Sequence, residues 1–300
     1  KYGGAGPEIA SRAHTDAISK AVSSALKEAN IDKSLLDAVA VTYGAGLLGA
    51  LLVGLSFAKS FAYALGVPLI AVNHIRGHMA AAYLADPALE PPFITLLASG
   101  GHTAILYTKS YTEFEILGST RDDAAGEAMD KAARVLGLPY PGGPNIERLA
   151  REGKNCIPFP RTFRGNGYDF SYSGLKTAVI NYCHNKEQKG EEYSRADVAA
   201  SFQCAACDVL VERAVSAALE CGCKTIAAGG GVIANTYLRE SLVRECAANG
   251  LRAVLPEKKF CTDNAAMIAA EGLVQYRARN FSDLSLNACA HIPLGKKGKQ

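Results

Sequence analysis

Short apolar runs alternate with longer segments of helical character in the first part of the chain. The runs at 38–42 and 69–72 have the composition of buried strands. The segments at 8–30, 44–66 and 75–84 carry the periodicity or the turn signals of helices. Because parallel strands need a crossover connection, usually a helix, this alternation predicts an α/β fold with a largely parallel sheet covered by helices.

The middle of the chain opens with strands that follow one another directly. Residues 92–98 and 103–108 flank Ser99-Gly-Gly-His102 and predict a β-hairpin, and residues 113–119 predict a third strand. The elements expected after them are helices at 126–136, 145–151, 195–220, 238–249 and 263–277, and strands at 225–228 and 251–255. We therefore expect a first lobe at 1–92, completed by the C-terminal segment 278–295, and a second lobe at 93–277.

Composition places the chain among ordinary globular proteins. Hydrophobic residues make up 49% of its 300 residues and charged residues 20%, so a substantial core is expected. The net charge of +3, from 32 basic and 29 acidic residues, neither requires nor excludes a nucleic-acid partner.

The cysteines and the most apolar stretch indicate a cytoplasmic protein without membrane attachment. Nine cysteines form no regular disulfide framework. Cys204 and Cys207 form a CxxC, but they lie in an apolar-periodic segment with no second CxxC, so we expect buried helix cysteines. The stretch 47–65 is interrupted by two serines and a lysine, which favours a buried helix over a membrane span.

His74 and His78 form the most informative pair of polar residues in the chain. Asn73 precedes them as a favourable helix N-cap, so both histidines are expected on the first turn of a helix, on one face. Two imidazole nitrogens at that spacing can reach one ion at roughly 2.0–2.1 Å, and a third ligand has to come from elsewhere. Asp263 is ordinarily a helix cap, yet its carboxylate could complete a two-histidine, one-carboxylate site suited to iron or zinc. A helix that merely exposes two histidines is the alternative.

Three glycine-rich segments are candidates for contact with a ligand. Residues 44–49 and 229–234 match dinucleotide-binding patterns, but neither is followed by an acidic residue at the end of the next strand, which argues against NAD. Helix–strand packing is the expected role of 44–49, whereas the second loop is expected to contact a ligand because Asn235 follows it at a helix start. The hairpin tip at 99–102 and this second loop together resemble the two glycine loops with which actin-like ATPases hold a nucleotide between two lobes.

Nine motifs, taken in order, resemble one family. They lie at 2–12, 44–54, 73–78, 99–103, 126–131, 140–144, 169–176, 229–235 and 261–264. In these motifs the chain resembles the TsaD family of bacterial tRNA threonylcarbamoyltransferases, whose archaeal and eukaryotic relatives belong to the KEOPS complex. The resemblance implies an actin-like, two-lobed fold of the ASKHA superfamily, the class of HSP70 and sugar kinases. It also implies an opening strand and loop before Lys1, so the N-terminal strand region of that fold is expected to be missing here.

The same resemblance implies the reaction and its participants. The threonylcarbamoyl group would pass, with the help of a metal, from threonylcarbamoyl-AMP to N6 of the adenosine 3′ to the anticodon in tRNA. The product is t6A, and AMP leaves. One divalent metal ion (iron or zinc) and an adenylate substrate or ATP, ADP or AMP are the expected ligands, and the proteins TsaB and TsaE are the expected partners.

The family's functional residues can be placed on this sequence one by one. His74, His78 and Asp263 correspond to the metal ligands. The adenylate would be held by Leu97, Ala98, Ser99, Gly100 and Gly101, with Asp130, Gly143, Glu147 and Asn235 around its ribose and base. Glu147 stands where bacterial members often have Asp, which keeps the carboxylate and lengthens its reach. Asp130 could act as a base, although a ribose-binding carboxylate is its expected role.

No nucleophile triad stands out, and none is needed for an acyl donor that is an already activated carbamoyl–phosphate anhydride. Arg161, Arg164 and Lys176 are expected to contact tRNA phosphates, with a solvated loop as the alternative.

Two further functions are left open: a nucleotide-binding ATPase or scaffold subunit of a tRNA-modification complex, and a metallopeptidase. The peptidase is less favoured, because Ile75 stands where a HExxH motif has its catalytic Glu.

Overall fold

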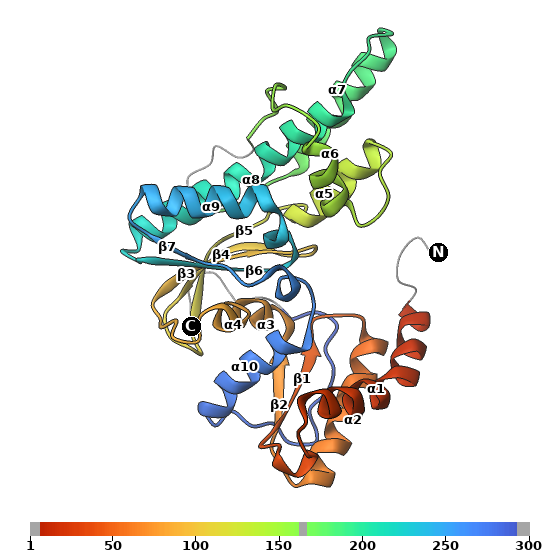
Figure 1. Cartoon of the computed structure of the whole chain (residues 1–300), viewed down its shortest axis with the longest axis vertical. Coiled ribbons are helices and arrows are strands. Elements are labelled where there is room, and N and C mark those ends of the chain that lie inside the picture. The colour runs from red at the N-terminus through yellow and green to blue at the C-terminus, as the bar shows by residue number, and fades with distance from the viewer. Residues whose placement is uncertain (1–6, 162–166, 293–300) are drawn as a thin grey trace. The chain divides into compact units, whose positions relative to one another are not determined.

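Figure 1 shows the computed structural model of the chain, which describes residues 7–161 and 167–292. These residues fall into two units, of which unit 1 comprises 7–80 and 264–292 and unit 2 comprises 81–161 and 167–263. Each unit contains a β-sheet of its own with helices packed against it. The predicted α/β class is therefore confirmed.

Unit 1 contains a two-stranded parallel sheet made of β1 (Val39–Gly44) and β2 (Leu69–Asn73). The strands are connected by α2 (Leu48–Leu65), which ends at Gly66 with φ of 67°, a conformation that favours glycine. The other elements of the unit are α1 (Pro7–Ala29), the 3-10 turn η1 (Lys33–Leu35), α3 (His74–Ala80) and α10 (Ala265–Arg277). Helix α10 packs against α3 and against both strands.

The segment after α10 continues along the sheet of unit 1. The Ser282 N–H donates to the Leu69 carbonyl at 2.8 Å, and the Cys289 N–H donates to the Tyr43 carbonyl at 2.8 Å. Unit 1 is therefore built from two stretches of chain that are far apart in the sequence.

The boundaries between the units differ from the predicted ones. The prediction divided the chain after residues 92 and 277, whereas the structure divides it after Ala80 and Asp263. Residues 82–93 belong to unit 2 because Ala82, Leu89 and Phe93 are buried with Ala227 and Val254 of that unit. Helix α10 belongs to unit 1 because it packs on α3, β1 and β2. Neither association is visible in local sequence patterns.

Unit 2 is organised around a five-stranded sheet in the order β5-β4-β3-β6-β7 (Figure 1). Strands β3 (Phe93–Ala98), β4 (Thr103–Thr108) and β5 (Phe114–Ser119) are antiparallel neighbours, as the hairpin pattern predicted. Strand β6 (Thr225–Gly229) pairs in parallel with β3, and β7 (Arg252–Val254) pairs in parallel with β6. All six residues of β3 are buried, which fits its continuous apolar sequence.

The helices of unit 2 pack around α8 (Arg195–Glu220), which contacts β3, β4 and β6. Ser194 caps its N-terminus by accepting a hydrogen bond from the Asp197 N–H, and both ends match the prediction. The remaining elements are α4 (Ala82–Ala85), α5 (Ala125–Val135), α6 (Gly142–Ala150), α7 (Ser173–Gln188), η2 (Gly231–Ala234), α9 (Thr236–Ala248) and η3 (Lys258–Phe260). Helix α7 was not predicted, because its buried side is a narrow stripe of Leu175, Val179 and Cys183.

Helix α2 is less buried than its sequence predicted. Among the described residues it is the one helix long and apolar enough to span a bilayer, judged by length and composition alone. Only Leu55, Ala58 and Ala62 of this helix are buried, while Leu48 and Leu52 are exposed. The expectation of a buried helix therefore holds for one side of α2 only, and unit 1 presents apolar side chains along the rest of this helix.

Candidate functional site

The two histidines of α3 lie side by side at the end of β2. The Asn73 side chain accepts a hydrogen bond from the Ile75 N–H at 2.8 Å, which confirms the predicted N-cap. The rings of His74 and His78 have centroids 4.7 Å apart and meet edge to face at 72°. His78 is 2% exposed, so packing holds its imidazole in place.

Asp263 completes a group of three possible metal ligands. One nitrogen of each histidine and one carboxylate oxygen of Asp263 lie within 4.8 Å of one another. Asp263 is not the cap of α10, because the next residue, Asn264, accepts the hydrogen bond from the Met267 N–H at 2.8 Å. Neutral nitrogens with one carboxylate oxygen suit either metal, and three protein ligands leave positions for a substrate.

Glycines let the loops of unit 2 approach one another closely around the hairpin between β3 and β4. The Ser99 N–H donates to the His102 carbonyl at 2.8 Å and so closes the turn. A Cβ atom at Gly126, near the start of α5, would lie 2.8 Å from the Ser99 carbonyl oxygen. Gly230 has φ of 101° and a Cβ atom there would collide with the Ala98 carbonyl. The structure thus brings the predicted adenylate-binding segment against the loop after β6.

Asp130 and the loop before α6 form a second close contact. The Gly142 N–H donates to Asp130 Oδ1 at 2.6 Å, so this carboxylate stabilises the N-terminus of α6. A Cβ atom at Gly142 would lie 2.5 Å from the Asp130 Cα atom, which explains the need for glycine. Gly143, the residue predicted to contact the adenylate, follows directly. Asp130 therefore keeps one carboxylate oxygen for a ligand or a proton.

Glu147 is tied to the start of α9. Its Oε1 accepts hydrogen bonds from the Thr236 hydroxyl at 2.6 Å and from Arg151 at 2.7 Å. Burial favours the neutral carboxyl, but these hydrogen bonds lower the pKa of Glu147 below its ordinary value of 4.5. Lys258 also donates to the Thr236 hydroxyl at 2.7 Å. The sequence did not reveal Thr236, Arg151 or Lys258 as members of this network.

The depressed pKa of Glu147 predicts a pH-dependent contribution to stability. A carboxyl with a lowered folded-state pKa stabilises the fold fully above about pH 4.5, and this contribution is lost as the pH falls through the folded-state value. Glu147→Gln should therefore lower Tm most at neutral pH, with a difference from wild type that narrows in acid. Thermal melts of both proteins across this range test the idea, with the exposed Glu152→Gln as control. A difference that does not change with pH would contradict it.

Asn235 is 6% exposed and its side chain already has structural partners. Its Oδ1 accepts from the Leu238 N–H at 3.0 Å, so it caps α9, as its place at a helix start predicted. Its Nδ2 donates to Gln203 Oε1 at 2.8 Å. One amide hydrogen of Asn235 remains for a ligand. Gln203 is a buried polar residue of α8 that the sequence analysis did not identify.

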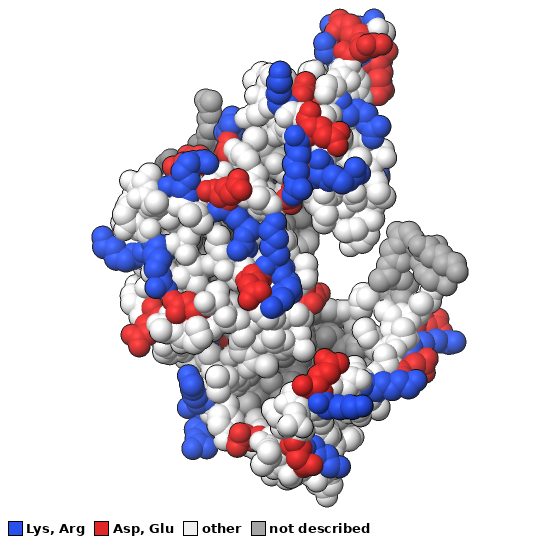
Figure 2. All heavy atoms as spheres, in the orientation of Figure 1, with Lys and Arg blue, Asp and Glu red and all other residues white. Residues whose placement is uncertain are grey.

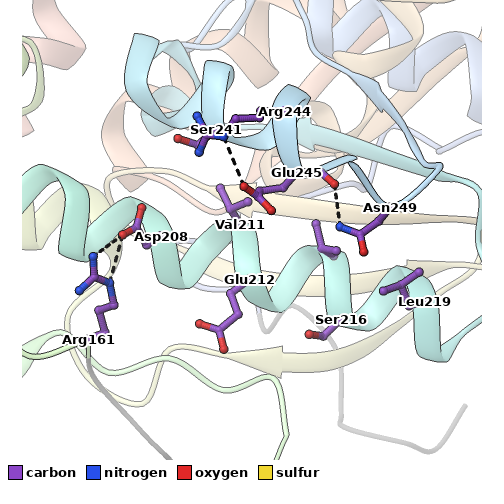
Figure 3. A pocket seen from close by; sticks show the side chains of 11 residues that line it. Arg161, Asp208, Val211, Glu212, Ser216, Leu219, Ser241, Arg244, Glu245 and Asn249 are labelled. Atoms are coloured by element: carbon purple, nitrogen blue, oxygen red, sulfur yellow. Dashed lines mark hydrogen bonds and ion pairs between the residues drawn. The ribbon is translucent and has the colours of Figure 1, made fainter. Parts of the chain in front are cut away.

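The basic residues that were expected to meet tRNA have partners within unit 2. Arg161 binds Asp208 Oδ2 through Nε at 3.0 Å and Nη2 at 2.6 Å. This pair borders a cavity of about 390 Å³ between α8 and α9, with Val211, Val215 and Leu219 among its lining (Figure 3). Lys176 Nζ lies 3.5 Å from Asp123 Oδ2, and Arg164 lies outside the described residues. The role of these residues in tRNA binding stays a prediction.

The CxxC cysteines are structural, as predicted. Cys204 and Cys207 are buried in α8, and burial raises the pKa of both thiols. Within the described residues no cysteine takes part in a disulfide.

The fold as a whole resembles that of solved proteins of one class. The full-length HypF structure in its phosphate- and nucleotide-bound form aligns with a TM-score of 0.63 at 16% identity, over 88% of this chain and 50% of that one. HypF from T. kodakarensis aligns with a TM-score of 0.58 at 20% identity, over 78% of this chain and 40% of that one. The chain thus has the fold of the ASKHA class, to which actin, HSP70 and the sugar kinases belong.

Sequence comparison narrows this class to one family. The profile of TsaD, described as tRNA N6-adenosine threonylcarbamoyltransferase, matches residues 1–270. A protein of that name from Clostridium botulinum (strain 657 / Type Ba4) is 52% identical over 299 residues, which are 99% of this chain and 88% of the relative. Its counterpart from Moorella thermoacetica is 55% identical over 296 residues, which are 98% of this chain and 86% of the relative. The chain belongs to the TsaD family.

Proposed function

We propose that the chain transfers a threonylcarbamoyl group from threonylcarbamoyl-AMP to N6 of the adenosine 3′ to the anticodon in tRNA. The observation that carries this proposal is identity of about half over nearly the whole chain with relatives named tRNA N6-adenosine threonylcarbamoyltransferase. The N6 nitrogen attacks the carbamoyl carbon and loses a proton, while the bond from that carbon to the phosphate oxygen breaks. The products are t6A and AMP.

The adenylate would lie on the glycine loops of unit 2. A Cβ atom at Gly100 or Gly101 would meet nothing within 4 Å, so the backbone there is open to a phosphate. Leu97, Ala98 and Ser99 lead into this turn, and the loop at Gly230 supports it from the other side. The residues proposed to surround the ribose and base are Asp130, Gly143, the ionised Glu147 and Asn235. The anhydride is already activated, so orientation is the main task of these residues.

A conservative substitution can show whether Asp130 binds the ribose or accepts the proton from N6. Asp130→Asn keeps an acceptor for the Gly142 N–H but removes the charge that a ribose hydroxyl would bind. Because a hydrogen bond to a charged group contributes roughly 1.5–3 kcal/mol, we expect KM for the adenylate to rise about tenfold, with kcat and Tm nearly unchanged. Steady-state kinetics with threonylcarbamoyl-AMP provide the measurement. A fall in kcat at constant KM would instead make Asp130 the group that takes the proton from N6.

His74, His78 and Asp263 would hold one iron or zinc ion. When bound, the ion supplies Lewis-acid stabilisation of charge on the donor oxygens. The fit is supported by three ligand atoms of suitable chemistry within 4.8 Å of one another. The metallopeptidase alternative finds no support here, since Ile75 occupies the position of the catalytic glutamate in such enzymes.

Macromolecular partners would meet two exposed surfaces. Lys and Arg side chains gather over α6 and α9 in Figure 2, and the exposed Arg148, Arg151, Lys258 and Lys259 belong to this part of unit 2. We expect tRNA phosphates to bind there in a salt-dependent manner.

The exposed leucines of α2 would be covered by a protein partner, with TsaB as the candidate and TsaE as a further component. A protein of this kind would work in the cytoplasm, where its tRNA substrate is found.

One assay separates the transferase from the alternative of an ATPase or scaffold. The full chain is incubated with threonylcarbamoyl-AMP labelled in its threonine, tRNA, and TsaB and TsaE. Label in tRNA that requires the target adenosine supports the transferase. Label that stays in the adenylate pool, with ATP hydrolysed in a parallel reaction, supports the ATPase or scaffold.

A further inference from the structure

A partly buried ion pair joins α3 to α10 inside unit 1. Arg76 Nε lies 2.6 Å from Glu271 Oε1, and the two side chains are 20% and 4% exposed. The Gln275 side chain donates a second hydrogen bond to the same oxygen at 2.6 Å. The Glu271 carboxylate is thus held from both helices, by an arginine of α3 and by a glutamine of its own helix.

The two helices are also in unusually close contact beside this pair. A Cβ atom at Gly77 would lie 2.7 Å from Ile268 Cδ1, so side chains of α10 pack directly on the backbone of α3. A Cβ atom at Gly272 would lie 2.5 Å from the Ala40 Cβ atom, so α10 approaches β1 in the same way. Close packing fixes the distance between α3 and α10, and the burial of Ile75, His78 and Ala80 limits the rotation of α3 about its axis.

The ion pair adds a directed polar contact to this packing. Helix α3 has only seven residues, and each residue corresponds to about 100° of rotation. Arg76 lies between the two histidines in the sequence, so a directed Arg76–Glu271 contact also sets where His74 and His78 point. Stability alone gives little reason for such a pair, because the desolvation of the buried Glu271 carboxylate and the partly buried Arg76 offsets much of their attraction. Ligands of metal sites are commonly oriented by hydrogen-bonded neighbours of this kind.

We propose that Arg76 and Glu271 are positioning residues of the metal site. Their ion pair holds α3 on α10 in the rotation that presents both histidine rings to one ion, beside the start of α10 that Asp263 precedes. This inference rests on the metal site proposed above and adds to it two residues that do not touch the ion.

The test separates positioning from stability. Co²⁺ is titrated into the metal-free full chain of the wild type, of Glu271→Gln and of the double variant Arg76→Met/Glu271→Leu. The cobalt absorption spectrum reports ligand geometry, and thermal melts without metal report stability.

We expect the double variant to melt near the wild-type temperature, because an apolar pair can replace buried charges. It should nevertheless bind Co²⁺ about 10–100-fold more weakly and with an altered spectrum. Glu271→Gln should weaken binding to a smaller extent.

A matched control is available on the other side of the same unit. Leu55→Ala removes a side chain of α2 that is 2% exposed, so it should lower Tm while leaving Co²⁺ affinity unchanged. If Glu271→Gln and the double variant both bind Co²⁺ with wild-type affinity and spectrum, the positioning role is overturned and the proposed metal site stands. If the wild type itself binds no Co²⁺, Zn²⁺ or Fe²⁺, the metal site fails and the positioning role fails with it.

Discussion

Replacing His78 by alanine is expected to remove metal binding and, with it, threonylcarbamoyl transfer. His78 is the most buried of the three candidate ligands, so no flexible neighbour can take its place. Loss of a residue that only orients a ligand costs 10–100-fold in affinity, and loss of the ligand itself should cost more than about 100-fold. Metal content after dialysis and label transfer to tRNA are the two measurements.

The exposed His184→Ala on α7 serves as the matched control, since it removes an imidazole from a helix of unit 2. A melt without metal establishes that His78→Ala still folds, and His78→Asn preserves more of the volume if it does not. Full metal content and full transfer activity in a folded His78 variant would refute the assignment.

Replacing Gly230 by alanine is expected to disrupt the proposed adenylate site by displacing the end of β3. The residue has φ of 101° and its Cβ atom would collide with the Ala98 carbonyl, so the loop and the end of β3 must separate. Backbone strain of this kind costs about 1–3 kcal/mol. Displacement of the segment that leads into Ser99 by about 1 Å should lower transfer about 100-fold, with a corresponding loss of AMP affinity.

Gly222→Ala is the control for Gly230→Ala. It introduces the backbone strain of a non-glycine residue at positive φ without displacing a neighbouring segment. Gly222 also has positive φ, 67°, but a Cβ atom there meets nothing within 4 Å. The control should lose about 1 kcal/mol of stability and keep its affinity for AMP. Equal AMP affinities in the two variants, measured by calorimetry, would show that the contact between Gly230 and Ala98 does not shape the adenylate site.

Local patterns were sufficient for most elements of the fold. The limits of α8 and the hairpin of β3 and β4 were predicted from apolar periodicity, a serine cap and a glycine turn. The prediction failed where long-range packing decides. The range 75–84 breaks into α3 and α4 around Ala81, and α4 joins unit 2 through Ala82.

The candidate site shows the same division between local and distant information. The spacing of His74 and His78 was visible because four residues make one helical turn. The contact of Glu147 with Thr236 joins residues 89 positions apart, and that of Arg76 with Glu271 joins residues 195 positions apart. No periodicity reports such pairs, since they exist only once the chain has folded back on itself.

The return of the last segment to the sheet of unit 1 has a consequence for the order of synthesis. The described part of unit 2 has been synthesised once residue 263 has left the ribosome, whereas unit 1 lacks α10 and the contacts of Ser282 and Cys289 until later in synthesis. Domains generally fold as units while the chain emerges, so unit 2 should form first. The nascent chain would then carry a folded unit 2 while the helix pair beside the histidines is still incomplete. A metal site that depends on α3 being held against α10, as proposed above, would therefore be completed late in synthesis.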